Sequence, residues 1–207
     1  MSSRAVFDQV RACGVVAIIR TGSAEVAQRQ AERVLEAGLP VVEVSLTTPG
    51  ALSVISALAS SSDAVIGAGT VTSAALAHEA IAAGSRILVS PNMVPAVIEV
   101  AVEHDVAVLP GCMTPTEMTT AMDLGATAVK IFPAQVWSPH ALRGLLQALP
   151  DLPCVPTGGI GPDDAADWIA AGAAAVGVGS ALTAAENVTD VVAALGARIA
   201  RTRSTDA

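Results

Sequence analysis

Aromatic and basic side chains are scarce in this chain of 207 residues. It has two tryptophans, two phenylalanines and no tyrosine, and 11 basic residues stand against 19 acidic ones, giving a formal net charge of -8. Nucleic-acid binding relies on clustered lysines and arginines that neutralise phosphates, with aromatic rings that stack on bases. The sequence has no such cluster, so we predict that no nucleic acid is a partner.

Long apolar runs and paired cysteines are also absent. No run approaches the roughly 20 apolar residues of a membrane-spanning helix, and Arg4, Asp8 and Gln9 lie where a signal peptide would have its apolar stretch. The three cysteines, Cys13, Cys112 and Cys154, are odd in number, widely separated and without the spacing of a metal motif. We therefore expect a soluble, cytoplasmic protein that has no membrane partner and keeps its thiols reduced in the core.

The chain has a single lysine. Ten of the eleven basic residues are arginines, and the eleventh is Lys130. It lies in the apolar run 126–132, which predicts that its side chain is buried. Burial in apolar surroundings favours the neutral form of an amine, and only that form is a nucleophile.

With 52% hydrophobic residues, the chain can form a large core. Eight short runs rich in Val, Ile and Leu alternate with Ala-rich segments of helical spacing, which is typical of a parallel α/β fold. The predicted strands are 15–20, 41–46, 64–69, 86–90, 106–109, 127–132, 154–157 and 175–179. The clearest predicted helices are 23–37, 73–83, 114–124 and 162–171, each followed by a turn containing glycine.

Eight strand and helix units with no segment to spare predict a (β/α)8 TIM barrel, formed by residues 1–207 as a single domain. A further helix over 4–12 would plug the amino-terminal end of such a barrel. Residues 202–207 are expected to form a frayed tail.

Active sites of such barrels lie at the carboxyl ends of the strands. Because side chains alternate along a strand, the apolar face formed by Val42 and Val44 turns toward the helices and Glu43 turns inward. The same alternation turns Lys130 inward. A neutral lysine can form an imine with a ketone, and a neighbouring carboxylate can act as its general acid/base. The alternative is a buried Glu43–Lys130 ion pair with only a structural role.

Two glycine-rich segments follow the last two predicted strands, Thr157-Gly-Gly-Ile-Gly161 and Gly177-Val-Gly-Ser-Ala181. Glycines let backbone N–H groups approach an anion closely, and this is where barrels often bind phosphate. The alternative is that the glycines serve only tight turns. Because both loops occur together, we expect a phosphate site.

Several motifs together resemble the class I aldolases for 2-keto-3-deoxy-6-phosphogluconate (KDPG) and 4-hydroxy-2-oxoglutarate (KHG), from residue 15 to residue 182. These motifs are Gly14-Val-Val-Ala-Ile-Ile-Arg20, Val42-Glu-Val-Ser-Leu46, Ile66-Gly-Ala-Gly-Thr-Val71, Val89-Ser-Pro-Asn92, Leu109-Pro-Gly-Cys-Met-Thr-Pro-Thr-Glu117, Val129-Lys-Ile-Phe-Pro-Ala134, Pro156-Thr-Gly-Gly-Ile160 and Val178-Gly-Ser-Ala-Leu182.

The resemblance implies an aldehyde-lyase that reversibly cleaves a 2-keto-4-hydroxy acid to pyruvate and an aldehyde, as a homotrimer with no metal or organic cofactor. It makes Lys130 the Schiff-base lysine and Glu43 the general acid/base. The implied substrate-binding residues are Thr70 and Pro91 in the pyruvate pocket, Phe132 beside the imine, and Gly158, Gly159 and Ser180 at the phosphate.

One position departs from the best-known pattern of this family. Many members have a carboxylate-binding arginine where this chain has Thr47. We expect Arg20, together with Thr47 and Thr70, to bind the pyruvate carboxylate instead, although Arg20 could simply bridge to Glu43. The departure leaves open the galactonate-derived epimer of KDPG as substrate. The loops 47–51 and 134–139 are expected to distinguish the two stereoisomers.

Two other functions remain open on the sequence. One is a sugar-phosphate isomerase or epimerase barrel, which would explain the glycine loops but not the buried lysine. The other is a barrel that binds a ligand without turnover. No histidine has a second ligand at the spacing of a metal site, so we predict no metal.

Overall fold

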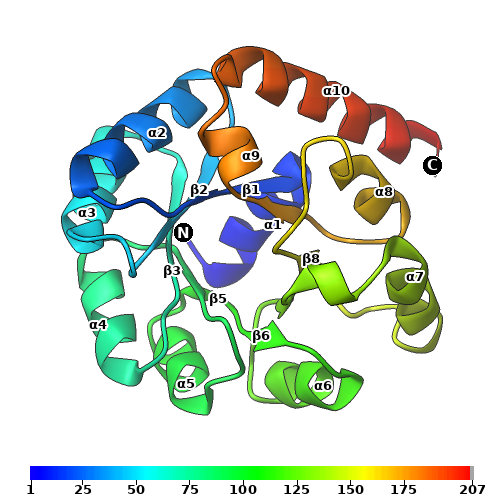
Figure 1. Ribbon diagram of the computed structural model, residues 1–207. Coiled ribbons are helices and arrows are strands. Elements are labelled where there is room, and N and C mark those ends of the chain that lie inside the picture. The colour runs from blue at the N-terminus through cyan, green and yellow to red at the C-terminus, as the bar shows by residue number, and fades with distance from the viewer. Residues whose placement is uncertain (206–207) are drawn as a thin grey trace.

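The computed structural model describes residues 1–205 and has an α/β fold (Figure 1). The strands are β1 (Val15–Ile19), β2 (Val41–Ser45), β3 (Val65–Gly69), β4 (Ile87–Val89), β5 (Ala107–Leu109), β6 (Gly111–Cys112), β7 (Val129–Ile131), β8 (Cys154–Pro156) and β9 (Val176–Val178). The helices are α1 (Ser3–Cys13), α2 (Ala24–Glu36), α3 (Ala51–Ser61), α4 (Ala74–Ala82), α5 (Pro95–Glu103), α6 (Pro115–Asp123), α7 (Pro139–Ala148), α8 (Ala165–Ala170), α9 (Ser180–Thr183) and α10 (Val188–Thr205), with the 3-10 turn η1 (Ala134–Val136).

The strands form two parallel sheets that curve around a common interior, with most of the helices outside them (Figure 1). The larger sheet has the order β5-β4-β3-β2-β1-β9, and the smaller one has the order β6-β7-β8. The backbone N–H of Lys130 donates to the carbonyl of Pro110 at 2.9 Å, and a parallel bridge joins Thr157 to Gly177. The eight predicted strands are confirmed, and the two-residue strand β6 is an addition to them.

Alternation of side chains separates the inside of the sheets from the layer under the helices. Val42 and Val44 belong to the larger apolar core, which includes residues of the surrounding helices, and Val129 and Ile131 of β7 belong to the same core. Ala128 instead belongs to a smaller interior core. The intervening positions of these strands therefore face inward, as the sequence predicts.

Helix α1 covers the amino ends of the strands. Its apolar side chains Val6, Phe7 and Val10 are buried in the interior core. Their partners include the first residues of four strands, Val41, Val65, Ile87 and Ala107. The prediction of a plugging helix is thus confirmed, and the accessible end of the interior is the carboxyl end.

The carboxyl-terminal segment corrects a prediction. Residues 202–205 continue α10 instead of forming a frayed tail, and residues 206 and 207 lie outside the described part. The reason is a long-range contact: the guanidinium of Arg203 donates to the backbone carbonyls of Arg11 and Ala12 at the end of α1. Within residues 1–205, no helix is long and apolar enough to cross a membrane.

Candidate functional site

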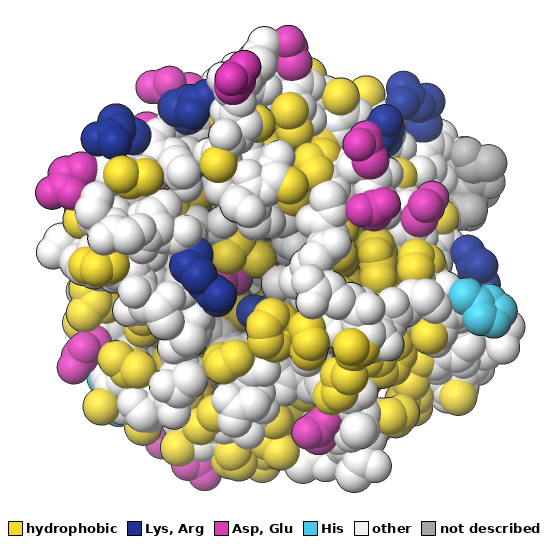
Figure 2. Space-filling view, in the orientation of Figure 1, with side chains coloured by type: hydrophobic (Ala, Val, Ile, Leu, Met, Phe, Trp, Pro, Cys, Tyr) yellow, Lys and Arg dark blue, Asp and Glu magenta, His cyan; other side chains and the backbone are white. Residues whose placement is uncertain are grey.

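A cavity of about 530 Å³ opens at the carboxyl ends of the strands. Figure 2 shows it as a hollow at the centre of this face, where basic, acidic and apolar side chains meet. Its lining is Ile18, Arg20, Glu43, Lys130, Phe132, Thr157, Gly158, Gly159, Ile160, Gly161, Asp164, Gly177, Gly179, Ser180 and Ala181. Seven of the ten residues that the sequence predicts for the site are in this lining.

Glu43 lies in the middle of β2 and is only 4% exposed. Its carboxylate extends over Gly69 at the end of the neighbouring strand β3, where a Cβ atom on residue 69 would overlap it. The missing side chain at Gly69 therefore leaves the space that the carboxylate occupies.

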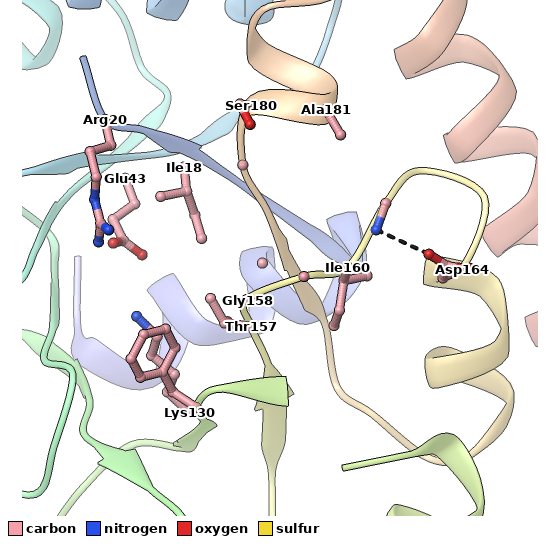
Figure 3. A pocket seen from close by; sticks show the side chains of 15 residues that line it. Ile18, Arg20, Glu43, Lys130, Thr157, Gly158, Ile160, Asp164, Ser180 and Ala181 are labelled. Atoms are coloured by element: carbon pink, nitrogen blue, oxygen red, sulfur yellow. Dashed lines mark hydrogen bonds between the residues drawn. The ribbon is translucent and has the colours of Figure 1, made fainter. Parts of the chain in front are cut away.

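Lys130 lies in the middle of β7 and is 5% exposed. Its Nζ atom lies 4.7 Å from the centre of the Phe132 ring, two residues along the strand. The side chains of Arg20, Glu43 and Lys130 point toward one another (Figure 3). The three groups come from β2, β7 and the end of β1, so only the folded chain brings them together.

Burial acts on both ionisable groups at the base of the cavity. It lowers the pKa of Lys130, and the positive charge of Arg20 lowers it further, while the carboxylate of Glu43 opposes the shift. Burial also raises the pKa of Glu43, against the attraction of Lys130 and Arg20 for its negative charge. Both shifts favour the neutral forms, which suits an amine nucleophile and a carboxyl group that donates and accepts protons.

The sequence leaves open an ion pair of Glu43 with Lys130 or with Arg20. Among the described residues, no ion pair within 4.0 Å joins Glu43 to Lys130 or to Arg20, and the one such pair is between Arg198 and Asp163. The amine and the guanidinium are thus not held on the carboxylate, and both face the cavity.

The opposite end of the cavity is formed by the two glycine-rich loops. Gly158 and Gly159 have φ angles of +96° and +77°, a left-handed backbone that side chains rarely adopt. Within residues 1–205, the backbone N–H groups of Gly158, Gly159 and Ser180 have no hydrogen-bond partner in the protein. They are donors available to an oxyanion, in the place where the sequence predicts a phosphate.

Three predicted substrate-binding residues lie outside this lining: Thr47, Thr70 and Pro91. The hydroxyl of Ser45 is hydrogen-bonded to Thr47 Oγ1 at 2.9 Å and to Thr70 Oγ1 at 2.8 Å. Ser45 has the same inward parity as Glu43, so this hydroxyl cluster lies above the carboxylate on β2. Thr70 has a φ of +62°, so its conformation is imposed by the fold.

Sequence reasoning missed other residues of the lining. Ile18 could have been found, because it shares the inward parity of Arg20 on β1. Thr157 and Ala181 lie within the motifs shared with the aldolases, but the resemblance implied no role for them. The carboxylate of Asp164 had no sequence signal, since it reaches the cavity from the loop before α8.

A metal ion would need a cluster of ligating side chains. The described residues contain no group of three or more His, Cys, Asp or Glu side chains that could hold a metal ion. His78 and His104 instead contact each other as rings, with centroids 5.3 Å apart.

The chain is similar in sequence to known aldolases. The family model for KDPG and KHG aldolase matches residues 6–195. The chain is 37% identical to the 2-dehydro-3-deoxy-6-phosphogalactonate aldolase of Escherichia coli K12, over 81% of this chain and 83% of that one. It is 34% identical to the 2-dehydro-3-deoxy-phosphogluconate aldolase of Pseudoalteromonas atlantica, over 82% and 78%.

A solved structure shares the fold. It is the KDPG aldolase of Legionella pneumophila with pyruvate captured as a covalent carbinolamine intermediate, at a TM-score of 0.82 and 26% identity. The match covers 95% of this chain and 98% of that one.

Proposed function

The chain belongs to the KDPG and KHG aldolase family, and we propose that Lys130 and Glu43 are the catalytic pair of its Schiff-base aldol cleavage. The observation that carries this proposal is the sole lysine of the chain, buried in the cavity beside a buried carboxylate and a guanidinium. The captured carbinolamine of the Legionella relative supports the same chemistry.

The reaction begins when the neutral amine of Lys130 attacks the C2 carbonyl of the substrate. Glu43 donates its proton to the hydroxyl of the resulting carbinolamine, which leaves as water, so that a protonated imine and the Glu43 carboxylate remain. Glu43 then takes the proton of the C4 hydroxyl, the bond between C3 and C4 breaks, and its electron pair moves into the iminium to give an enamine. The aldehyde leaves, Glu43 returns the proton to C3, and hydrolysis of the imine releases pyruvate.

The two ends of the cavity fit the two ends of such a substrate. Arg20 is the cation available for the carboxylate beside the imine, with the hydroxyls of Thr47 and Thr70 nearby through Ser45. Phe132 packs beside Lys130. The free N–H groups of Gly158, Gly159 and Ser180 receive the phosphate.

The substrate we propose is 2-keto-3-deoxy-6-phosphogluconate, cleaved to pyruvate and glyceraldehyde 3-phosphate, with 4-hydroxy-2-oxoglutarate as a further substrate. The galactonate epimer is the alternative, and the names of the two relatives include both sugars. Thr47 and Thr70 would lie near the reacting end, whereas loop 134–139 would meet the distal end.

We also propose how the sheets close and how the chain assembles. The hydrogen bonds between the two sheets support a single (β/α)8 barrel and a single domain over residues 1–207. The homotrimer and the cytoplasmic location stay predictions. Sedimentation of the purified protein would test the first of them.

The test of the chemistry is reductive trapping. The protein is incubated with pyruvate and borohydride, and the adduct is located by intact mass and peptide mapping. Modification of the Lys130 peptide in wild type, and its absence in Lys130→Met, is the expected result. An unmodified Lys130 with pyruvate in excess would overturn the mechanism in favour of an isomerase or epimerase. Cleavage rates with the two epimers then identify the substrate.

A further inference from the structure

The distal end of the cavity contains a carboxylate. Asp164 lines the same cavity as Gly158, Gly159 and Ser180, and its Oδ2 accepts a hydrogen bond from the backbone N–H of Gly161 at 3.3 Å. Figure 3 shows this contact at the end of the cavity away from Arg20, Glu43 and Lys130. A negative charge thus lines the same cavity as the donors that would receive a phosphate.

The local backbone explains this orientation. Asp164 directly precedes α8, but its side chain makes no capping hydrogen bond to that helix. It turns back onto the glycine loop and occupies the N–H of Gly161. One donor of this loop is therefore already engaged by an anion of the protein itself.

Among the described residues, the cavity lining has no cation at this end. The two cationic residues in the cavity lining are Arg20 and Lys130, both at the opposite end. Figure 2 shows acidic side chains over α8, on the same face as the hollow. Of the nearby acids, Asp163 is paired with Arg198, outside the lining. A phosphate dianion would meet repulsion here that a neutral hydroxyl would not meet.

We propose that Asp164 is a specificity-determining residue that weakens the binding of a dianionic phosphate end relative to an uncharged end. This inference rests on the proposed function, because it assumes that the distal glycine loops receive the end of the substrate remote from the imine. It implies that the enzyme also accepts unphosphorylated aldehydes, with a smaller preference for phosphate than the backbone donors alone would produce.

The test is Asp164→Asn, which removes the charge and keeps an oxygen that can accept from Gly161. In aldol synthesis with saturating pyruvate, KM is measured for glyceraldehyde 3-phosphate and for glyceraldehyde. We expect the ratio of the two KM values to shift toward the phosphorylated aldehyde by about three- to tenfold, as for removal of one partly solvated charge. Inorganic phosphate should also become a stronger competitive inhibitor, and high salt should reduce the difference.

The matched control is Asp163→Asn, which removes the same charge one residue earlier, from a side chain that is 87% exposed and outside the cavity. Little change in the ratio is expected there. An equal shift in both variants, or no shift in Asp164→Asn, would overturn the inference while phosphate still competes with the wild type. Failure of phosphate to compete in any variant would instead overturn the phosphate site of the proposed function, and this inference with it.

Discussion

The carboxylate of Glu43 fills the space above Gly69, so the position of one residue depends on the missing side chain of the other. The two residues lie on neighbouring parallel strands, where Glu43 pairs in register with Gly67 and Ser45 pairs with Gly69. The side chain of Glu43 therefore leans along its strand toward the open end of the interior. Gly69 thus shapes the cavity without offering a functional group.

Gly69→Ala tests this relationship. The new methyl group would displace the carboxylate, and because a positioned general acid/base contributes about 10²- to 10⁴-fold, we expect kcat to fall at least about 100-fold. Gly144→Ala in α7 is the control, since nothing lies within 4 Å of its added Cβ. A Gly69→Ala enzyme with unchanged kcat would show that Glu43 does not need this position.

The ionisation of Lys130 should respond in opposite directions to its two charged neighbours. Glu43 raises the pKa of Lys130 and Arg20 lowers it. Glu43→Gln should therefore move the pH midpoint of amine reactivity down, and Arg20→Gln should move it up. The rate of reductive methylation by formaldehyde and cyanoborohydride, followed on the Lys130 peptide, measures this midpoint without requiring turnover. Shifts of the same sign in both variants would contradict the electrostatic account.

Thr48 is expected to position Arg20. Its side chain is 2% exposed, and Oγ1 accepts a hydrogen bond at 3.1 Å from the backbone N–H of Thr21, the residue after Arg20. Thr48→Val keeps the shape and removes the acceptor, which is worth about 1 kcal/mol, so KM for pyruvate should rise roughly fivefold. Thr48→Ser keeps the acceptor, so its KM for pyruvate should stay close to that of the wild type. If Val and Ser variants bind pyruvate equally well, the hydroxyl has no positioning role.

The plug helix α1 should lose part of its anchoring in acid. The carboxylate of Asp105 accepts hydrogen bonds from the backbone N–H and the hydroxyl of Ser3, and these lower the pKa of Asp105. A lowered pKa in the folded state contributes stability above the unfolded value of about 3.9, and that contribution is lost as the pH falls through the folded value.

Asp105→Asn should therefore be less stable than wild type at pH 7, and the difference should shrink as the pH falls below the unfolded value of about 3.9. Urea unfolding across this range measures it. Asparagine suits this substitution, because it tolerates the φ of +50° at this position. A difference that stays constant down to pH 3 would contradict a role for the carboxylate charge.

The amino-acid sequence alone was sufficient for the order of the elements and for the inward direction of Glu43 and Lys130. Both depend on short-range periodicity, since a strand alternates its side chains whatever its neighbours are. It was also sufficient for the glycine loops at the distal end of the cavity. The family resemblance added roles that no periodicity could supply.

Only the tertiary structure decided which loop residues reach the cavity. Thr47, Thr70 and Pro91 lie outside its lining and Asp164 lies within it, because a loop side chain takes its direction from packing with distant segments. The same holds for residues 202–205, which are helical where Arg203 meets the end of α1. Local pattern thus determined the inward amine and carboxylate, and long-range contact determined the charge at the opposite end of the cavity.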